Sequence, residues 1–284
     1  MFTPVISKII SMQQSLTVSE NEIAQYVINH PDTVVTSTIT AIARNTNTSE
    51  ASINRFCKKI GFKGFNSFKV ALAQDTFYSN MQRSETQGRD SFITSISKDY
   101  NNMLVNTTAM LDDEQVFQAA NAIRRANRIY IFSSAATALI AHELEFKLGM
   151  AGIYAKAVTD SDTIYIHANN VAADDLVIAI APTLFMRDFY RAVALCKENG
   201  AALISITSYD SPKLSNLIDY KFIISDKITT RYSVSISNSL MFLYTADVLY
   251  CALLESDKTL KQNRLNNDSR LNSQQRMDPS FFEY

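Results

Sequence analysis

The sequence predicts two folds in one chain: an all-α domain over residues 1–83, followed by an α/β domain over residues 113–254. Two patterns predict this division. In the first part, apolar residues recur at helical spacing between short polar turns. From about residue 113 onward, near-continuous runs of Ile, Val and Leu alternate with helical stretches, which is typical of a parallel sheet covered by helices on both faces. The length of 284 residues is also that of about two domains.

Composition excludes several classes of protein. Hydrophobic residues make up 46% of the chain and charged residues 19%, which is ordinary for a globular protein. The three cysteines, Cys57, Cys196 and Cys251, form no CxxC pair, so zinc fingers and disulfide scaffolds are not expected. The most apolar stretch, Leu240–Leu254, is shorter than the ~20 residues of a membrane span and contains Asp247. A charged-then-apolar leader is also missing, so we expect a cytoplasmic protein with no membrane partner. We also expect no metal and no cofactor.

Polar capping residues divide residues 1–83 into short helices. Ser19 with Glu22 fits a capping box, and Pro31 lies just beyond the helix that this box begins. Ser37 or Thr38 begins the next helix. An Asn-Thr-Asn-Thr turn over residues 45–48 separates that helix from a third one. Two short helices joined by a tight turn predict a helix-turn-helix.

The helix that follows this turn has one apolar face. Ser49 is its expected N-cap and Gly61 its expected end. Its apolar residues recur at i, i+3, i+4 and i+7: Ile53, Phe56, Cys57 and Ile60. The surrounding residues 51–74 hold five Lys or Arg and no acid. This local positive charge favours a polyanionic partner, although the net charge of the whole chain is −1.

The second helix of a helix-turn-helix lies in the major groove of DNA. Arg55 can present a bidentate fork to guanine, and Asn54 can do the same for adenine. The lysines are better suited to phosphates. The candidate DNA-binding residues are Ser49, Glu50, Ser52, Asn54, Arg55, Lys58, Lys59 and Lys63. The alternative interpretation is the solvated, charged face of a small helical domain.

A specific run of residues links this region to a known family. It consists of Ser49, Ile53, Arg55-Phe56 and the continuous stretch Cys57–Phe65, and it extends to Phe68-Lys69 and Leu72. Earlier matches are Leu16-Thr17, Glu22–Val27, Asn29–Pro31 and Ile42-Ala43. With these residues, the stretch 16–73 resembles the amino-terminal domain of the RpiR family of bacterial transcription regulators. The resemblance favours DNA binding over a merely solvated surface.

Five apolar runs are the expected strands of the second domain: Ile129–Phe132, Ile153–Val158, Leu176–Ala181, Ala202–Thr207 and Tyr220–Ile224. The helical stretches between them are Thr137–Met150, Ser161–Asn170, Arg187–Asn199 and Pro212–Leu217. A long helix over Arg231–Leu254 closes the domain. Residues 84–112 form a polar linker and a connecting helix, and residues 255–284 form a polar tail that we expect to be only partly ordered.

Members of the RpiR family carry a sugar isomerase (SIS) domain, which has a five-stranded parallel sheet with helices on both faces. Residues 113–254 resemble this domain in the order and spacing of their elements, including the runs Arg128–Phe132, Asp175–Ile180 and Asn199–Ala201. The resemblance implies that two loops at the carboxyl ends of strands recognise a sugar phosphate. Ligands bind at this edge in open α/β sheets, and phosphates prefer the N–H groups at helix starts.

Both loops lack the glycines of the family pattern. The first loop is Ser-Ser-Ala-Ala-Thr over residues 133–137, with Ser133 and Ala135 at the glycine positions. The second is Ala-Pro-Thr-Leu-Phe-Met over residues 181–186, with Leu184 in place of glycine and Met186 in place of threonine. A Cβ narrows backbone approach and disfavours φ > 0, and Pro182 removes an N–H donor. We therefore expect either a changed ligand or no ligand at these loops.

Several hydroxyl groups remain as candidate effector-binding groups: Ser133, Ser134, Thr137, Thr183 and Ser211. Arg187 and Arg231 are the candidate cations. The alternative is that these residues serve only as helix caps and loop residues. His142 and His167 lie on expected helices without metal-ligand spacing, and no catalytic residue can be assigned.

These patterns predict a DNA-binding transcriptional regulator of carbohydrate-related metabolism, with a dimerising SIS-type sensor domain and no enzymatic activity. A single helix-turn-helix offers few base contacts, so we expect a homodimer or higher homo-oligomer on an inverted repeat in duplex DNA. The apolar helices 92–110 and 231–254 pack either across subunits or within the domain core. The alternatives are a phosphosugar-binding protein or isomerase, and an oligomerisation module without a ligand.

Overall fold

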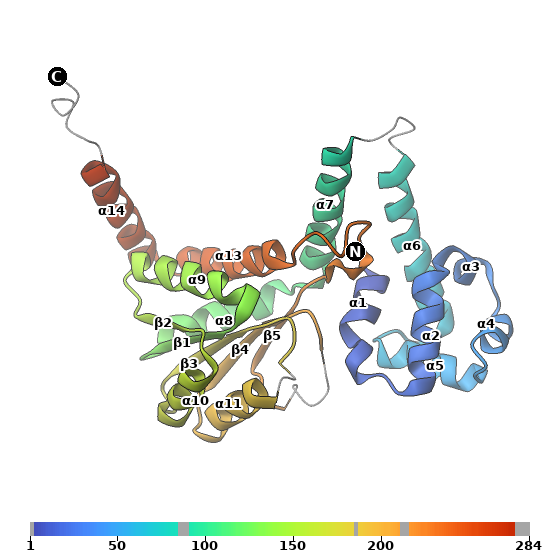
Figure 1. Cartoon of the computed structure of the whole chain (residues 1–284), viewed down its shortest axis with the longest axis horizontal. Helices are drawn as coiled ribbons and strands as arrows, with labels where there is room; N and C mark the ends of the chain where they lie inside the picture. Colours follow the sequence, from blue (N-terminus) through green and yellow to red (C-terminus); the bar gives the residue numbers. More distant parts are fainter. Residues whose placement is uncertain (1–2, 85–90, 185–186, 211–215, 276–284) are drawn as a thin grey trace.

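The computed structural model describes residues 3–84, 91–184, 187–210 and 216–275 (Figure 1). Its first part consists of helices and turns, and its second part is a five-stranded sheet between two layers of helices. The expected fold class is therefore confirmed. The helices of the first part are α1 (Val5–Met12), α2 (Val18–Asn29), α3 (Pro31–Thr36), α4 (Ile39–Asn45), α5 (Glu50–Lys59) and α6 (Phe65–Ser84), with a 3-10 turn, η1 (Gln13–Ser15), after α1.

The helices α1 to α6 enclose one hydrophobic core. Ile23 and Val27 of α2, Ile42 of α4, and Ile53 and Phe56 of α5 each expose at most 1% of their surface. Helices as short as α4 and α5 are marginal in water on their own, so burial of these apolar faces is what stabilises them.

The expected ends of the short helices are confirmed where a local cap sets them. The Ser49 hydroxyl accepts the N–H of Ser52 at 3.1 Å and begins α5. The Thr38 hydroxyl accepts the N–H of Ala41 at 3.2 Å and begins α4. Gly61 follows α5 with φ of +93°, a left-handed conformation in which glycine commonly ends a helix.

The start of α2 differs from the expected one. The capping box is formed by Thr17 and Glu20, whose carboxylate accepts the Thr17 N–H at 2.8 Å, and not by Ser19 and Glu22. Both pairs have the required spacing, so the local pattern does not choose between them. A distant contact favours the first pair, because Lys59 of α5 lies 2.6 Å from the Glu20 carboxylate.

Pro31 begins a helix that the sequence pattern did not predict. It is the first residue of α3, a position that proline tolerates because the N–H there has no partner within the helix. Val34 of this helix is fully buried in the domain core. Only His30 therefore separates α2 from the new helix.

The sheet of the second part is formed by β1 (Ile129–Ser133), β2 (Ala155–Val158), β3 (Leu176–Ile180), β4 (Ala202–Thr207) and β5 (Tyr220–Ile223). The strand order is β2-β1-β3-β4-β5, and every neighbouring pair is parallel. Ile129 of β1 aligns with Ala155 on one side and with Leu176 on the other. All five strands therefore end at the same edge of the sheet.

Helices cover both faces of the sheet: α8 (Asp113–Arg125), α9 (Ala138–Ala151) and α13 (Ser239–Ser256) lie on one face, and α10 (Ser161–Asn170) and α11 (Arg187–Glu198) lie on the other. Further helices of this part are α7 (Phe92–Met110) and α14 (Lys258–Gln275), with the 3-10 turns η2 (Ala135–Thr137) and η3 (Lys227–Thr229). Ile129 and Ile131 face α8, α9 and α13, whereas Tyr130 and Phe132 face α10 and α11 (Figure 1). This alternation explains why each strand reads as a continuous apolar run.

The last helix of the sheet layer begins later than expected. Residues 231–238 are irregular, and α13 begins at Ser239. The Asn238 side chain donates to the Asp226 carboxylate at 2.7 Å and accepts the Lys227 N–H at 2.8 Å, which holds the preceding segment as a loop. Within the described residues, α13 alone is long and apolar enough to cross a membrane, and 44% of it is buried, partly against α8 and α9.

The polar tail contains an ordered helix, α14, which follows α13 and packs against α9. The side chains of Asn263 and Asn267 donate to the carbonyl oxygens of Ala151 and Met150 at 3.2 and 3.0 Å. These carbonyls belong to the last turn of α9, where they have no acceptor role within the helix. Much of the tail that the sequence predicts to be only partly ordered is therefore helical, over Lys258–Gln275. Residues 276–284 lie outside the described residues.

Candidate nucleic-acid interface and effector loops

The helix α5 presents two basic side chains on the face opposite the core. Arg55 and Lys58 are exposed, whereas Phe56 and Cys57 between them are fully buried. The Arg55 guanidinium donates to the Ser52 hydroxyl at 3.0 Å, which directs it along the helix toward its first turn. In a helix-turn-helix this first turn is the part that faces base edges.

Three other candidate residues of α5 are engaged within the domain. The Asn54 side-chain oxygen accepts the N–H of Phe65 at 3.1 Å and so caps the start of α6. The Lys59 ammonium donates to the Ser15 carbonyl at 2.9 Å in addition to its contact with Glu20. The Glu50 carboxylate accepts the Thr40 hydroxyl at 2.6 Å, which ties α4 to α5. In this structure these side chains position the helices, and the interpretation of Asn54 as a free bidentate reader of adenine is not supported by the geometry.

Lys63 lies in the turn between α5 and α6 and is exposed. It borders a shallow hollow of about 460 Å³ together with Ile39, Gly64 and Ser67, at the beginning of α6. A lysine beside the start of a helix suits a phosphate group. Arg44, in the last turn of α4, is also exposed and was not among the candidate residues. Its only sequence signal is a basic residue in the helix that precedes the turn.

The hydroxyls of the first effector loop point into the protein. The Ser133 hydroxyl lies 2.9 Å from the carbonyl oxygen of Ile180, and the Thr137 hydroxyl lies 3.1 Å from the same oxygen. Both side chains are buried. They therefore tie the end of β1 to the end of β3, whereas Ser134 between them reaches the surface.

Ala135 stands at a glycine position of the family pattern and still adopts the backbone that glycine would adopt. Its φ is +50°, in the left-handed region that residues with a Cβ seldom occupy. The residue is exposed. A Cβ at this position is expected to disfavour a positive φ, yet the backbone of Ala135 keeps a positive φ.

The second effector loop is anchored by its apolar residue. Leu184 is fully buried in the core beneath α10 and α11. The carbonyl of Pro182 accepts the Thr207 hydroxyl at 2.9 Å and the Ser208 N–H at 3.0 Å, which fixes this loop to the end of β4. Thr183 is half-buried, and its hydroxyl donates to the Gln14 side chain at 3.1 Å.

Some of the candidate effector residues cannot be placed. Ser211, Met186 and the side chain of Arg187 lie outside the described residues. Arg231 is exposed, with its guanidinium 5.5 Å from the Tyr232 ring. In the described ranges no group of three or more His, Cys, Asp or Glu could hold a metal ion.

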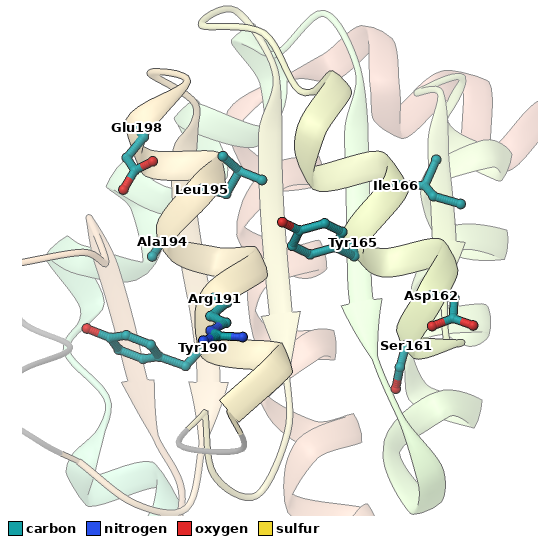
Figure 2. Close-up of a pocket in the computed structure, with 9 residues that line it drawn as sticks. All are labelled: Ser161, Asp162, Tyr165, Ile166, Tyr190, Arg191, Ala194, Leu195 and Glu198. Carbon is teal, nitrogen blue, oxygen red and sulfur yellow. The ribbon is translucent and has the colours of Figure 1, made fainter.

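A larger groove lies away from these loops. It measures about 800 Å³ and runs between α10 and α11 (Figure 2). Tyr165 and Leu195 point toward each other across it, and Arg191 lies beside them (Figure 2). None of the candidate effector residues that the structure describes lines this groove.

Comparison with known proteins assigns both parts of the chain. A model of the helix-turn-helix domain of the rpiR family matches residues 3–79, and a model of the SIS domain matches residues 122–250. The chain belongs to the RpiR family of transcriptional regulators. RpiR-family proteins combine a DNA-binding helix-turn-helix with a SIS domain, as the fold described above does.

Individual relatives match most of this RpiR-family chain. An HTH-type transcriptional regulator of Haemophilus influenzae is 26% identical over 274 residues, which cover 92% of this chain and 95% of that protein. The HTH-type regulator HexR of Escherichia coli is 28% identical over 73% of each chain. Among solved structures, NanR of Vibrio vulnificus complexed with ManNAc-6P has a TM-score of 0.60 and 21% identity, over 96% of this chain and 100% of that chain.

Proposed function

We propose that this RpiR-family regulator reads duplex DNA with α5, acts as a homodimer on an inverted repeat, and senses a carbohydrate derivative without catalysing a reaction. The observation that carries the first part is the exposed pair Arg55 and Lys58 opposite the buried Phe56. An arginine fork suits guanine, and a lysine suits the neighbouring phosphate. Lys63, in the turn before α6, and Arg44, on α4, are further exposed basic residues of the same domain.

Single substitutions test the DNA-binding surface. We expect Arg55→Ala to cost about 1–3 kcal/mol at a cognate site and to relax the base preference at one position. Lys58→Ala should weaken binding to all sequences alike and reduce its salt dependence. Arg125, an exposed arginine of α8, supplies the matched control Arg125→Ala. Unchanged operator affinity for both α5 variants in a low-salt titration would contradict the proposal.

The dimer is supported by exposed apolar side chains on the two helices that the sequence pointed to. Phe92 and Ile93 of α7 expose 64% and 75% of their surface, and Leu240 of α13 exposes 44%. Paired half-sites should then lie about 10 bp apart or a multiple of that distance. Light scattering checks the oligomeric state, and a monomer that keeps full operator affinity at micromolar concentration would contradict it.

The effector part rests on the edge where β1 and β3 end. Ser134 and Thr183 are partly exposed there and carry hydroxyl groups, whereas the third candidate, Ser211, lies outside the described residues. NanR, which shares this fold, was solved with a sugar phosphate. Against a strong phosphate site stand the buried Leu184, the missing N–H of Pro182 and the inward hydroxyls of Ser133 and Thr137. We therefore infer a carbohydrate derivative that relies little on a phosphate dianion.

Calorimetry with glucose 6-phosphate, ribose 5-phosphate, ManNAc-6P and the matching free sugars tests this part. Thr183→Val should weaken binding of whichever sugar binds, and Thr108→Val, which changes an exposed threonine of α7, should not. The free sugar should bind about as well as its phosphate ester. Micromolar binding that needs the phosphate and disappears in Thr183→Val would show that the family's phosphate cradle is intact. Absence of binding by every sugar would favour an oligomerisation module without a ligand.

A further inference from the structure

The helix α1 is part of the DNA-binding domain. Val5 and Ile9 are fully buried in the core of that domain. The Asp75 carboxylate of α6 accepts the N–H of Ile6 at 3.0 Å, so the free N–H groups at the start of α1 are satisfied from within the same domain. Any displacement of the DNA-binding domain therefore carries α1 with it.

The opposite face of α1 and η1 is docked on the sensor domain. Ser7, Ile10, Ser11 and Gln14 have the spacing i, i+3, i+4 and i+7, which places them along one side of the helix. Ser7, Ile10 and Ser11 expose no more than 3% of their surface. In Figure 1, α1 lies between the sheet and the other helices of the DNA-binding domain.

The docked face touches three successive strand ends. The Ser7 hydroxyl lies 3.1 Å from that of Ser225, after β5. The Ser11 carbonyl accepts the N–H of Asp210, after β4, at 2.6 Å. Gln14 accepts the Thr183 hydroxyl, after β3, at 3.1 Å. Since β3, β4 and β5 are neighbours in the sheet, α1 crosses the carboxyl edge strand by strand.

This edge is also where open α/β sheets bind ligands. The contact between Gln14 and Thr183 lies at the exposed rim of the docked face. A separate cavity of about 230 Å³ lies between α1 and the sheet edge, bordered by Lys8, Asp210 and Ile223, and neither Gln14 nor Thr183 lines it. Because Gln14 is exposed and Thr183 is half-buried, a small molecule can reach the contact between them.

We propose that the effector and Gln14 compete for the Thr183 hydroxyl, so that effector binding releases the DNA-binding domain from the carboxyl edge of its own sensor. This inference rests on the effector site proposed above. A hydroxyl has one proton to donate. A sugar oxygen that accepts the proton must therefore displace the Gln14 side chain, which is attached to the DNA-binding domain through η1 and α1.

The size of the effect follows from a single hydrogen bond. Such a bond at a protein surface changes an equilibrium by about two- to tenfold. Removing the Gln14 side chain should raise sugar affinity by up to that factor, because the competitor is gone. Linkage is reciprocal, so the change in operator affinity that the sugar causes should shrink by a similar factor.

The experiment compares the full-length wild type with Gln14→Ala, Thr183→Val and the control Gln25→Ala, an exposed glutamine of α2. The probes are the sugars and sugar phosphates named above, measured by calorimetry, with operator binding measured in their presence and absence. Amide hydrogen exchange over residues 5–15 is followed in parallel. We expect Gln14→Ala to bind the sugar two- to tenfold more tightly and Gln25→Ala to bind as the wild type does. Sugar-bound wild type and sugar-free Gln14→Ala should show the same faster exchange in residues 5–15.

The possible results separate this inference from the proposed effector site. Unchanged or weaker sugar binding by Gln14→Ala, together with lost binding by Thr183→Val, would overturn the competition and keep the site. Slower or unchanged exchange of residues 5–15 on sugar binding would also overturn it. Binding that is absent in the wild type but present in Gln14→Ala would support it, because the contact would then mask the site. Absence of binding in both would overturn the site and the competition together.

Discussion

The proposed recognition helix α5 and the candidate effector loops place their polar side chains in opposite ways. On α5, helical spacing separates the two tasks, because Ile53 and Phe56 hold the helix while Arg55 stays exposed. In the first effector loop, Ser133 and Thr137 hold the loop with the same hydroxyl groups that a ligand would need. A helix can therefore bind a partner with one face while the opposite face keeps it packed on the core. A loop, in contrast, uses part of its polar groups in hydrogen bonds that fix its own conformation.

The largest effect should come from breaking the anchor of α5. Phe56→Ala removes a fully buried ring from the core of the DNA-binding domain, which should cost about 3–5 kcal/mol of unfolding free energy. Operator binding should fall because the domain unfolds, and sugar binding by the other domain should persist. Chemical denaturation followed by circular dichroism checks this, with Val70→Ala, an exposed position on α6, as the control. Equal stability of both variants would show that α5 is not held by this face.

A change of pH should act on the DNA-binding domain through Asp75. Burial raises the pKa of this carboxyl to about 6 from an ordinary value of 3.8, although the N–H groups of Ile6 and Val5 act in the opposite direction. The folded state therefore binds the proton more tightly than the unfolded state. The contribution of Asp75 to stability should rise as pH falls from 7 to about 4, by at most about 3 kcal/mol, and stay constant below that range.

The variant Asp75→Asn separates the contribution of Asp75 to the pH dependence of stability from the contributions of other carboxylates. Hydrogen bonds hold the pKa of Asp160 low, and bonds to Arg128 help to hold that of Asp175 low, so both contribute in the opposite direction at acid pH. The difference in unfolding free energy between wild type and Asp75→Asn should therefore change with pH between pH 4 and 7, with the wild type gaining stability relative to the variant as pH falls. A flat difference would mean that Asp75 does not titrate in this window.

A subtler substitution sharpens the distinction between anchoring and reading within α5. Asn54→Ala should lower stability by about 0.5–2 kcal/mol, since the start of α6 loses the acceptor of the Phe65 N–H. It should leave base preference at the operator unchanged, unlike Arg55→Ala. Operator selection from a randomised library measures the preference. A shift at one base for Asn54→Ala would assign this residue to reading as well.

The smallest effect should come from the strained loop. Ala135→Gly removes the Cβ from a residue with φ of +50° and should stabilise the α/β domain by up to about 1 kcal/mol. Ala136→Gly next to it, in the 3-10 turn η2, should destabilise the domain by about the same amount. Thermal denaturation of the two variants compares them directly. Destabilisation by both would mean that the loop has no strain to relieve.

Local patterns predicted the fold and the helix α5, but they did not predict which polar groups of the loops are already hydrogen-bonded within the protein. The strand Ala202–Thr207 and the helix Ser161–Asn170 match their expected bounds because runs and caps contain the whole signal. The choice of Thr17 over Ser19 as a cap depends on Lys59, 39 residues from Glu20. No local rule contains such a partner.

The same reason explains the other differences. The Ser133 hydroxyl donates to the carbonyl oxygen of Ile180, 47 residues away, and the Asn54 side-chain oxygen accepts the Phe65 N–H at the start of the next helix. Residue type alone predicts that these groups can bind a ligand or a base. It does not predict that the protein has already used them. Exposed candidates such as Arg55 were predicted correctly as to position because helical spacing also predicts which face is turned outward.

The two faces of α1 bear on how such regulators can be recombined. A chimera that joins the first 84 residues of this chain to the sensor of a relative would transplant Ser7, Ile10 and Ser11 onto strand ends with which they did not evolve. The chain passes from one domain to the other between α6 and α7, but part of the surface by which the two domains contact each other lies on α1, at the beginning of the sequence. Chimeras that exchange α1 and η1 together with the sensor, and keep α2 to α6 as the DNA-binding part, preserve this contact. In such chimeras effector binding should still change DNA affinity, whereas in fusions made between α6 and α7 it should not.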